Sequence, residues 1–227
     1  MKVLRILLCI SVFLLFVSCT NTATDIITDT EEESEATFHT AVQAIVDKTF
    51  LNFNKQVTAT SDFIPEDYKI LADTRREIVG LDVLLKLWKS HISALIDLRI
   101  NDFQRWVKGE IDKTDFSDFR ELISEGERSI SERFIKLYSV QIREQIELLL
   151  REVDFDNFED CIIQYNAFCI THGNEGGQLQ QQADFRKLFT DIIEKSFTEK
   201  LSDAEEFYRT TPDPYMEPEV ARLFNLE

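Results

Sequence analysis

The stretch that decides the fold is residues 68–107, YKILADTRREIVGLDVLLKLWKSHISALIDLRINDFQRWV. Its apolar residues recur every three or four positions, at Leu71, Ile78, Leu81, Leu84, Trp88, Ile92, Leu95, Phe103 and Trp106. This spacing places them along one face of a helix. The pattern fits either one helix of about forty residues or two collinear helices that break at Gly80, and periodicity does not choose between them. In both cases the apolar face needs a partner surface.

Similar periodicity predicts four more helices. Their apolar faces span residues 38–53, 119–149, 157–172 and 185–207, with Gly126 a weak point in the second long one. Breaks are expected at 54–64, at 109–114 and at 174–182. Pro65, followed by Glu66 and Asp67, favours a helix start, since proline suits the first turn and acids favour the positive end of the dipole. The prolines from 212 to 218 end the last helix, and residues 220–224 form a final turn.

No segment alternates apolar and polar residues for long enough to predict a strand. Each predicted helix has an apolar face that another element must cover. The sequence therefore predicts an all-α fold, an irregular bundle of about five helices of which two are long.

An Asp-Phe pair recurs near three predicted helix starts, at Asp115, Asp154 and Asp184. One interpretation is a degenerate helical repeat that stacks into a solenoid, but true arrays keep a fixed period and these separations differ. The other is local: Asp caps the helix and the aromatic packs beside the cap. We favour the local interpretation.

The first residues of the chain follow the order of a secretory signal peptide. Lys2 and Arg5 precede an apolar run over residues 6–17, and Ser18 stands directly before Cys19. The run is shorter than the roughly 20 residues that a membrane-spanning helix needs. An ordinary secretory signal or a membrane-anchoring N-terminus are the alternatives.

The segment from Leu15 to Cys19, LFVSC, resembles the lipobox of bacterial lipoproteins, with Phe16 where leucine is usual. The resemblance implies that residues 1–18 are removed, that Cys19 is acylated and that it becomes the mature N-terminus. In that family an Asp after the cysteine favours retention in the inner membrane. Thr20 stands there instead, which favours the outer membrane.

Residues 19–35 are rich in Thr, Asp and Glu and include the acidic cluster 31–33. Low hydrophobicity and high charge predict a disordered tether, with a single helical domain over 36–227. The formal charge of the chain is −17, and residues 1–18 hold Lys2 and Arg5 but no acid, which leaves about −19 after their removal. Such a surface repels nucleic acid and anionic lipid headgroups. We expect no nucleic-acid partner.

The candidate metal ligands are few. Cys161 and Cys169 lie about 12 Å apart along one predicted helix, too far for a disulfide, and two buried thiols are expected. Cys169 and His172 are spaced i, i+3, and residues Glu35 and His39 are spaced i, i+4. Closed zinc sites need four ligands, so we expect neither pair to hold a metal and predict no cofactor.

No sequence motif for catalysis is present. There is no His-Glu-x-x-His run and no phosphate loop, and no His follows a Glu by three residues, as carboxylate-bridged di-iron bundles require. Ser90 and His91 are adjacent and on a helix point about 100° apart. A glycosidase-like carboxylate pair remains open, because the acids are too numerous to select one by sequence.

The chain has eighteen Phe, with Trp88, Trp106, Tyr138 and Tyr165 on predicted helical faces. These aromatics either line a pocket for a lipid or other apolar ligand or fill the core, and we favour the core. On a helical interpretation Trp88 should be buried and Trp106 should lie at the end of the bundle.

Near the C-terminus, Phe197-Thr198-Glu199 with Leu201, followed by residues 207–210 (FYRT) and Pro212, resembles an uncharacterised family of small helical periplasmic proteins. That family typically shows Phe-Thr-x-x-Glu-Leu and then Phe-Tyr-x-Thr-Pro-x-Gly-x-Lys. Here the spacing is shorter by about a residue, and Pro214 and Met216 replace the glycine and lysine. The resemblance implies a helical envelope domain and no catalytic residue.

These observations predict a bacterial cell-envelope protein held by a lipidated Cys19, with a non-enzymatic domain that binds an envelope protein or an apolar ligand. Two alternatives stay open. One is a hydrolase of envelope polymers that uses carboxylates, and the other is a structural spacer.

Overall fold

The computed structural model describes residues 31–59, 64–180, 184–211 and 218–224. The chain divides into two compact units, Met1–Ala36 and Thr37–Glu227. Cys19 and the predicted signal peptide lie outside the described residues. Over these ranges the helices are α2 (Glu31–Ala59), α3 (Ile70–Thr74), α4 (Leu81–Ile111), α5 (Phe119–Glu125), α6 (Ser129–Leu149), α7 (Asp156–Thr171), α8 (Phe185–Thr210) and α9 (Pro218–Leu223), with 3-10 turns η1 (Glu66–Tyr68) and η2 (Glu175–Gly177). No described residue is in a strand, which confirms the all-α class.

The described residues form eight α-helices, so the expected number of about five is wrong. Two glycines account for most of the difference. α3 ends at Thr74, and Gly80, with a left-handed φ of +87°, is the N-cap from which α4 begins. Gly126 separates α5 from α6 within the predicted long helix 119–149. The final turn adds α9.

Other helix boundaries also differ from the prediction. α2 begins at Glu31, so residues 31–35 are helical where the sequence predicted tether, and it continues to Ala59 past the break expected from residue 54. α4 passes through Gly109 and ends at Ile111. The sequence features at residue 54 and at Gly109 therefore do not end these two helices.

Of the three Asp-Phe pairs, only one marks a helix cap. Asp184 caps α8 by accepting a hydrogen bond from the backbone N–H of Lys187 at 2.9 Å. Asp115 and Asp154 instead accept from the N–H two residues ahead, at 2.9 and 3.0 Å, and form local turns before the helices begin. The hydrogen bond from the N–H of Ser117 is the largest cause that lowers the pKa of Asp115.

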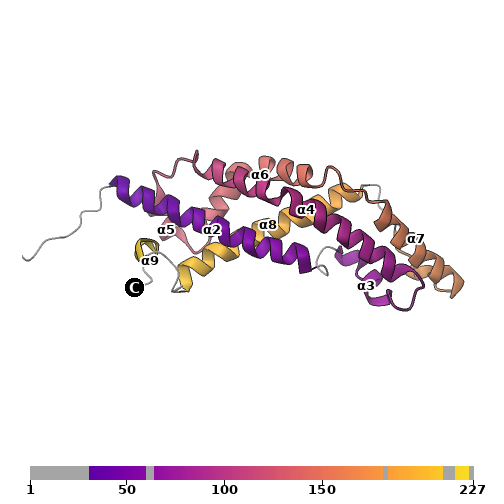
Figure 1. Cartoon of the computed structure of the whole chain (residues 1–227). Coiled ribbons are helices and arrows are strands. Elements are labelled where there is room, and N and C mark those ends of the chain that lie inside the picture. The colour runs from indigo at the N-terminus through magenta and orange to yellow at the C-terminus, as the bar shows by residue number, and fades with distance from the viewer. Residues whose placement is uncertain (1–30, 60–63, 181–183, 212–217, 225–227) are drawn as a thin grey trace, which may run out of the picture. The chain divides into compact units, whose positions relative to one another are not determined.

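Within the second unit, α6 packs against α8 and against α4, and the first half of α4 packs against α7. Figure 1 shows α3 and α7 beside one end of α4 and α5 beside the other. The core runs along these contacts and is rich in aromatic rings. Phe50, Phe103 and Phe197 bring α2, α4 and α8 together, with ring centroids 4.8 to 5.6 Å apart.

Candidate functional site

A surface depression of about 1050 Å³ lies where α5 meets α6. We call it the α5–α6 groove. Its lining includes three acids, three basic residues and two leucines: Leu122, Glu125, Gly126, Glu127, Arg128, Ser129, Glu132, Arg133, Lys136 and Leu137. Leu137 is 52% exposed, so the groove offers an apolar contact framed by both signs of charge.

A buried ion pair on α8 holds the two helix ends that form this groove. The side chain of Glu205 is fully buried, that of Arg209 is 7% exposed, and their charged atoms lie 2.8 Å apart. The Glu205 carboxylate accepts hydrogen bonds from the backbone N–H groups of Ile130 and Ser131, at 3.0 and 2.6 Å. A carboxylate from another helix therefore caps the N-terminus of α6, where the helix dipole favours negative charge.

Arg209 completes the connection from the other side. Its guanidinium donates to the carbonyls of Ile123 and Leu122, at 2.8 and 3.2 Å, and to the Ser129 hydroxyl at 3.0 Å. It also lies over the ring of Phe224, 5.3 Å from the centroid. The last carbonyls of α5 and the first N–H groups of α6 are thus fixed to one residue pair on α8.

The basic residues of the groove differ in the ion pairs and hydrogen bonds that they form. Arg128 donates through Nε to Glu206 at 2.8 Å, and this hydrogen bond is the largest cause that raises the pKa of Arg128. Arg133 pairs with Asp118 at 3.0 Å, although Nε of Arg133 and Oδ1 of Asp118 are buried without a hydrogen-bond partner. Lys136 forms no ion pair with the described residues. The exposed ammonium of Lys136 and the Leu137 side chain beside it are available to a partner.

A second depression of about 650 Å³ lies beside α6 and the start of α8 and is lined by Glu144, Gln145, Glu147, Leu148, Arg151 and Arg186. Arg186 is fixed by a hydrogen bond to the carbonyl of Leu150 and lies over the ring of Phe155. This depression is smaller, and none of its lining residues is an apolar side chain as exposed as Leu137. We therefore take the α5–α6 groove as the better candidate.

The residues considered as metal ligands from the sequence make other contacts in the structure. Cys161 and Cys169 are buried free thiols, and burial raises the pKa of Cys161 to about 12. His172 bonds through Nδ1 to the carbonyl of Phe168 at 2.9 Å and packs on that ring, at the end of α7 that Gly173 closes with φ +70°. His39 packs against Phe116. Among the described residues no group of three His, Cys, Asp or Glu is placed to hold a metal ion.

The carboxylates with shifted pKa values do not resemble a general acid. The pKa values of Asp82, Asp115 and Asp191 are all lowered, whereas a general acid at neutral pH needs a raised one. The most buried carboxylate, Glu205, is already occupied by Arg209 and two backbone N–H groups. Within the described ranges the structure therefore singles out no catalytic carboxylate pair.

The aromatic residues pack against one another. Trp88 is fully buried, as predicted, with Phe155, Phe158 and Phe189 at centroid distances of 5.1 to 5.4 Å. Trp106 is half-buried near the end of α4 and stacks on Phe103. No aromatic residue lines either depression. The rings fill the core, as the favoured interpretation predicted.

Sequence reasoning missed the pair Glu205–Arg209, although the chain carries a usable indication of it. Glu205 lies four residues after Leu201 and eight after Phe197, so it falls on the apolar face of α8. A charged residue in that register needs a buried partner, and Arg209 is the basic residue one turn further on.

No helix among the described residues is long and apolar enough to cross a membrane. Comparison of the chain with family models, with curated proteins and with solved structures finds no match.

Proposed function

We propose that this protein is a lipid-anchored component of the bacterial cell envelope whose helical domain binds another envelope protein without catalysing a reaction. Its anchor is the acylated Cys19, and its location is the outer membrane rather than the inner. The anchor rests on the order Lys2, Arg5, apolar run, Ser18 and Cys19. Several acyl chains on one residue hold a protein firmly, at about 0.8 kcal/mol for each buried methylene.

The α5–α6 groove is the observation that carries the binding half of the proposal. It offers an exposed leucine with charged side chains around it, among them Lys136, which has no ion-pair partner among the described residues. An apolar centre with a polar rim is the arrangement that protein–protein interfaces have. These residues do not form an enclosed apolar pocket of the kind that holds small ligands. A rigid frame supports the groove, because Glu205 and Arg209 fix both of its helix ends.

The anchor is tested with Cys19→Ser in the full chain. The wild type should incorporate a labelled fatty acid and sediment with outer-membrane fractions, and the variant should do neither. A wild-type protein that stays unlabelled contradicts lipidation at Cys19. Label in inner-membrane fractions alone contradicts the outer-membrane location.

The binding surface is tested with a photo-crosslinking amino acid at Lys136, in the groove, in cells that express the full chain. Lys195 on α8 is the matched control, since it is also an exposed lysine and its partner Glu199 is 3.8 Å away. We expect a discrete crosslinked protein from position 136 and none from position 195. The same adducts from both positions, or none from 136, would contradict the proposed groove.

A further inference from the structure

The outward face of α4 carries a stripe of large apolar and small side chains that no other described element covers. Val83, Leu87 and Leu98 are 60, 53 and 69% exposed, and Ser90 and Ala94 between them are exposed as well. We call these five residues the α4 stripe. The buried residues of α4 lie on its opposite side.

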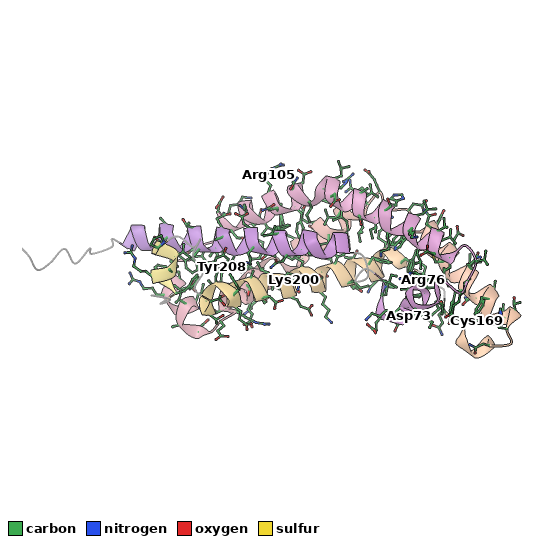
Figure 2. All side chains as sticks on the ribbon, turned by 60° about the horizontal axis from the view of Figure 1, so that its bottom comes forward. Asp73, Arg76, Arg105, Cys169, Lys200 and Tyr208 are labelled. Atoms are coloured by element: carbon green, nitrogen blue, oxygen red, sulfur yellow. The ribbon has the colours of Figure 1, made fainter. Side chains whose placement is uncertain are left out.

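Helical spacing places Arg105 on the same face of α4, seven residues beyond Leu98. Figure 2 shows the Arg105 side chain pointing away from the bundle. The stripe is therefore accessible along about four turns of helix.

The residues of the α4 stripe have the spacing of a helix face that packs against another helix. Its members follow one another at intervals of four, three, four and four residues. Alternating steps of three and four keep apolar side chains on one seam and let them interdigitate with a facing helix. Exposed single apolar residues are ordinary on a protein surface, but a seam that extends over four turns indicates an interface.

The stripe is complementary to itself when two copies run antiparallel. With the two-fold axis between residues 90 and 91, Leu87 faces Ala94 of the second copy, and Val83 faces Leu98 of the second copy. Each Leu87 therefore meets the small side chain of Ala94. The two Ser90 residues lie about 1.5 Å apart, measured along the helix axis. A two-fold axis of this kind closes the assembly at two copies.

The charges beside the stripe favour the same alignment. Lys86 and Asp97 are exposed and lie on the same flank of the stripe, near its opposite ends. In the antiparallel pair, Lys86 of one copy and Asp97 of the second copy are offset by only about 3 Å along the helix axis. Within its own chain Lys86 binds Asp82 at 2.6 Å, whereas Asp97 has no ion-pair partner among the described residues. The two-fold pairing therefore supplies a cation to each Asp97.

We propose that the protein forms a two-fold antiparallel dimer through the α4 stripe. The inference goes beyond the proposed function and depends neither on Cys19 nor on the α5–α6 groove. One helix face per copy gives an interface at the small end of the specific range, below about 1,200 Å² in total, so the dimer exchanges with monomer. The excess negative charge of each copy opposes pairing, but a Debye length of about 8 Å at physiological salt screens most of it.

The first test is sedimentation velocity of the detergent-solubilised full chain at physiological salt, over about 1 to 100 μM. We expect the dimer fraction to rise with concentration, and Leu98→Asp to weaken the dimer by about tenfold or more. Val140→Asp on α6 is the matched control, because Val140 is 66% exposed on another helix. A wild type that stays monomeric overturns the proposal, as does an equal loss in both variants.

The second test reads the direction of pairing. Ser90→Cys should crosslink two copies under mild oxidation or with a short bismaleimide. Val83→Cys and Leu98→Cys should not, because the two copies of each lie about 22 Å apart along the axis of an antiparallel pair. The wild-type chain sets the background from its own cysteines. Efficient crosslinking at position 83 or 98 shows a parallel or different pairing and overturns the alignment.

The third test is a charge exchange. Lys86→Asp places two acids across the interface and should weaken the dimer, and adding Asp97→Lys should restore it. Asp82→Ala removes the internal partner of Lys86 and should leave the dimer intact. Failure of the double variant to recover contradicts the contact between Lys86 and Asp97. None of these results bears on lipidation or on crosslinking at Lys136, so the two proposals fail separately.

Discussion

Glu205 and Arg209 occupy an environment from which water is excluded, and each depends on the other. The Glu205 side chain is fully buried, and its oxygens serve Arg209 and the first N–H groups of α6 together. Taking two charges out of water is costly, and the geometry recovers that cost only while both partners are present. The pair thus specifies how α5, α6 and α8 meet rather than adding much net stability.

Removal of one partner should therefore be worse than removal of both. We expect Glu205→Ala to lower the free energy of unfolding by about 3–5 kcal/mol, because it leaves the Arg209 guanidinium buried without a counter-charge. The double variant Glu205→Leu with Arg209→Met should lose less. Urea unfolding followed by circular dichroism measures both.

The exposed pair Arg128–Glu206 is the control for that comparison. Its two side chains are 47 and 41% exposed, so solvent screens the attraction, and Arg128→Ala should change stability far less than Glu205→Ala. A loss in Arg128→Ala as large as that in Glu205→Ala would show that burial is not the cause.

At the scale of elements, Gly80 and Gly109 have different effects on helix α4. Gly80 starts α4 with φ +87°, a conformation that strains any residue with a Cβ atom. Gly109 lies inside α4, and a Cβ there meets no atom within 4 Å. The same residue type thus interrupts the helix at one position and is only a weak helix former at the other.

Replacing each of these glycines by alanine should have effects of opposite sign. Gly80→Ala should destabilise the fold by about 1–2 kcal/mol, because alanine is strained at φ +87°. A steric clash is not the cause, since the added Cβ would lie at an ordinary 3.6 Å from Gln164. Gly109→Ala should stabilise it by about 0.5–1 kcal/mol, because alanine is the better helix former. Thermal unfolding of the two variants tests the pair, and a shift of equal sign in both would refute the role assigned to Gly80.

These glycines also show what the sequence could predict and what it could not. The 3.6-residue periodicity predicted the all-α class, because it follows from the need of each helix to bury one face. It could not choose between one helix and two at Gly80, since a break in backbone direction leaves the spacing of apolar residues unchanged. The α5–α6 groove was out of reach as well, because Arg209 and Leu122, which are far apart in the sequence, meet only through tertiary packing.

Arg143 joins two elements, α6 and α8, by contacting Asp191 and Glu194 at 2.7 Å each. Burial alone raises the pKa of Asp191, but hydrogen bonds from Lys187 and Arg143 outweigh it and hold the pKa below its ordinary value. A carboxylate with a lowered folded-state pKa contributes stability above its unfolded pKa. That stability is lost as the pH falls through the folded pKa.

Arg143→Met should therefore lower stability at pH 7 and flatten the loss of stability below about pH 4, where an unfolded Asp takes up protons. Near pH 2 the variant and the wild type should converge. Urea unfolding at a series of pH values provides the measurement. Lys195→Met removes an exposed ion pair within α8 and should leave the loss of stability at acid pH unchanged. If Arg143→Met lost stability at acid pH as steeply as the wild type, the role assigned to the contacts of Arg143 with Asp191 and Glu194 would be contradicted.

At the scale of the whole molecule, the density of aromatic rings around Trp88 decides between a filled core and a ligand pocket. Three phenylalanine rings from α7, from the turn before it and from α8 surround the indole at 5.1 to 5.4 Å, and its Nε1 has no hydrogen-bond partner. Trp88 therefore acts as an apolar filler. A protein interior packed in this way has no room for another molecule.

The wild-type chain should accordingly show no rise in melting temperature with lipids, indole or other small apolar compounds. Trp88→Ala should lose about 3–5 kcal/mol of stability and leave an apolar cavity. Indole should then raise the melting temperature of that variant in proportion to the logarithm of its concentration above the dissociation constant, because a ligand that binds only the folded state stabilises it. If the alanine variant is too unstable to purify, Trp88→Leu leaves a smaller cavity for the same titration with benzene. A logarithmic rise in the wild type would instead show that the aromatic interior is a binding pocket, since only a site already present can stabilise the unmodified protein.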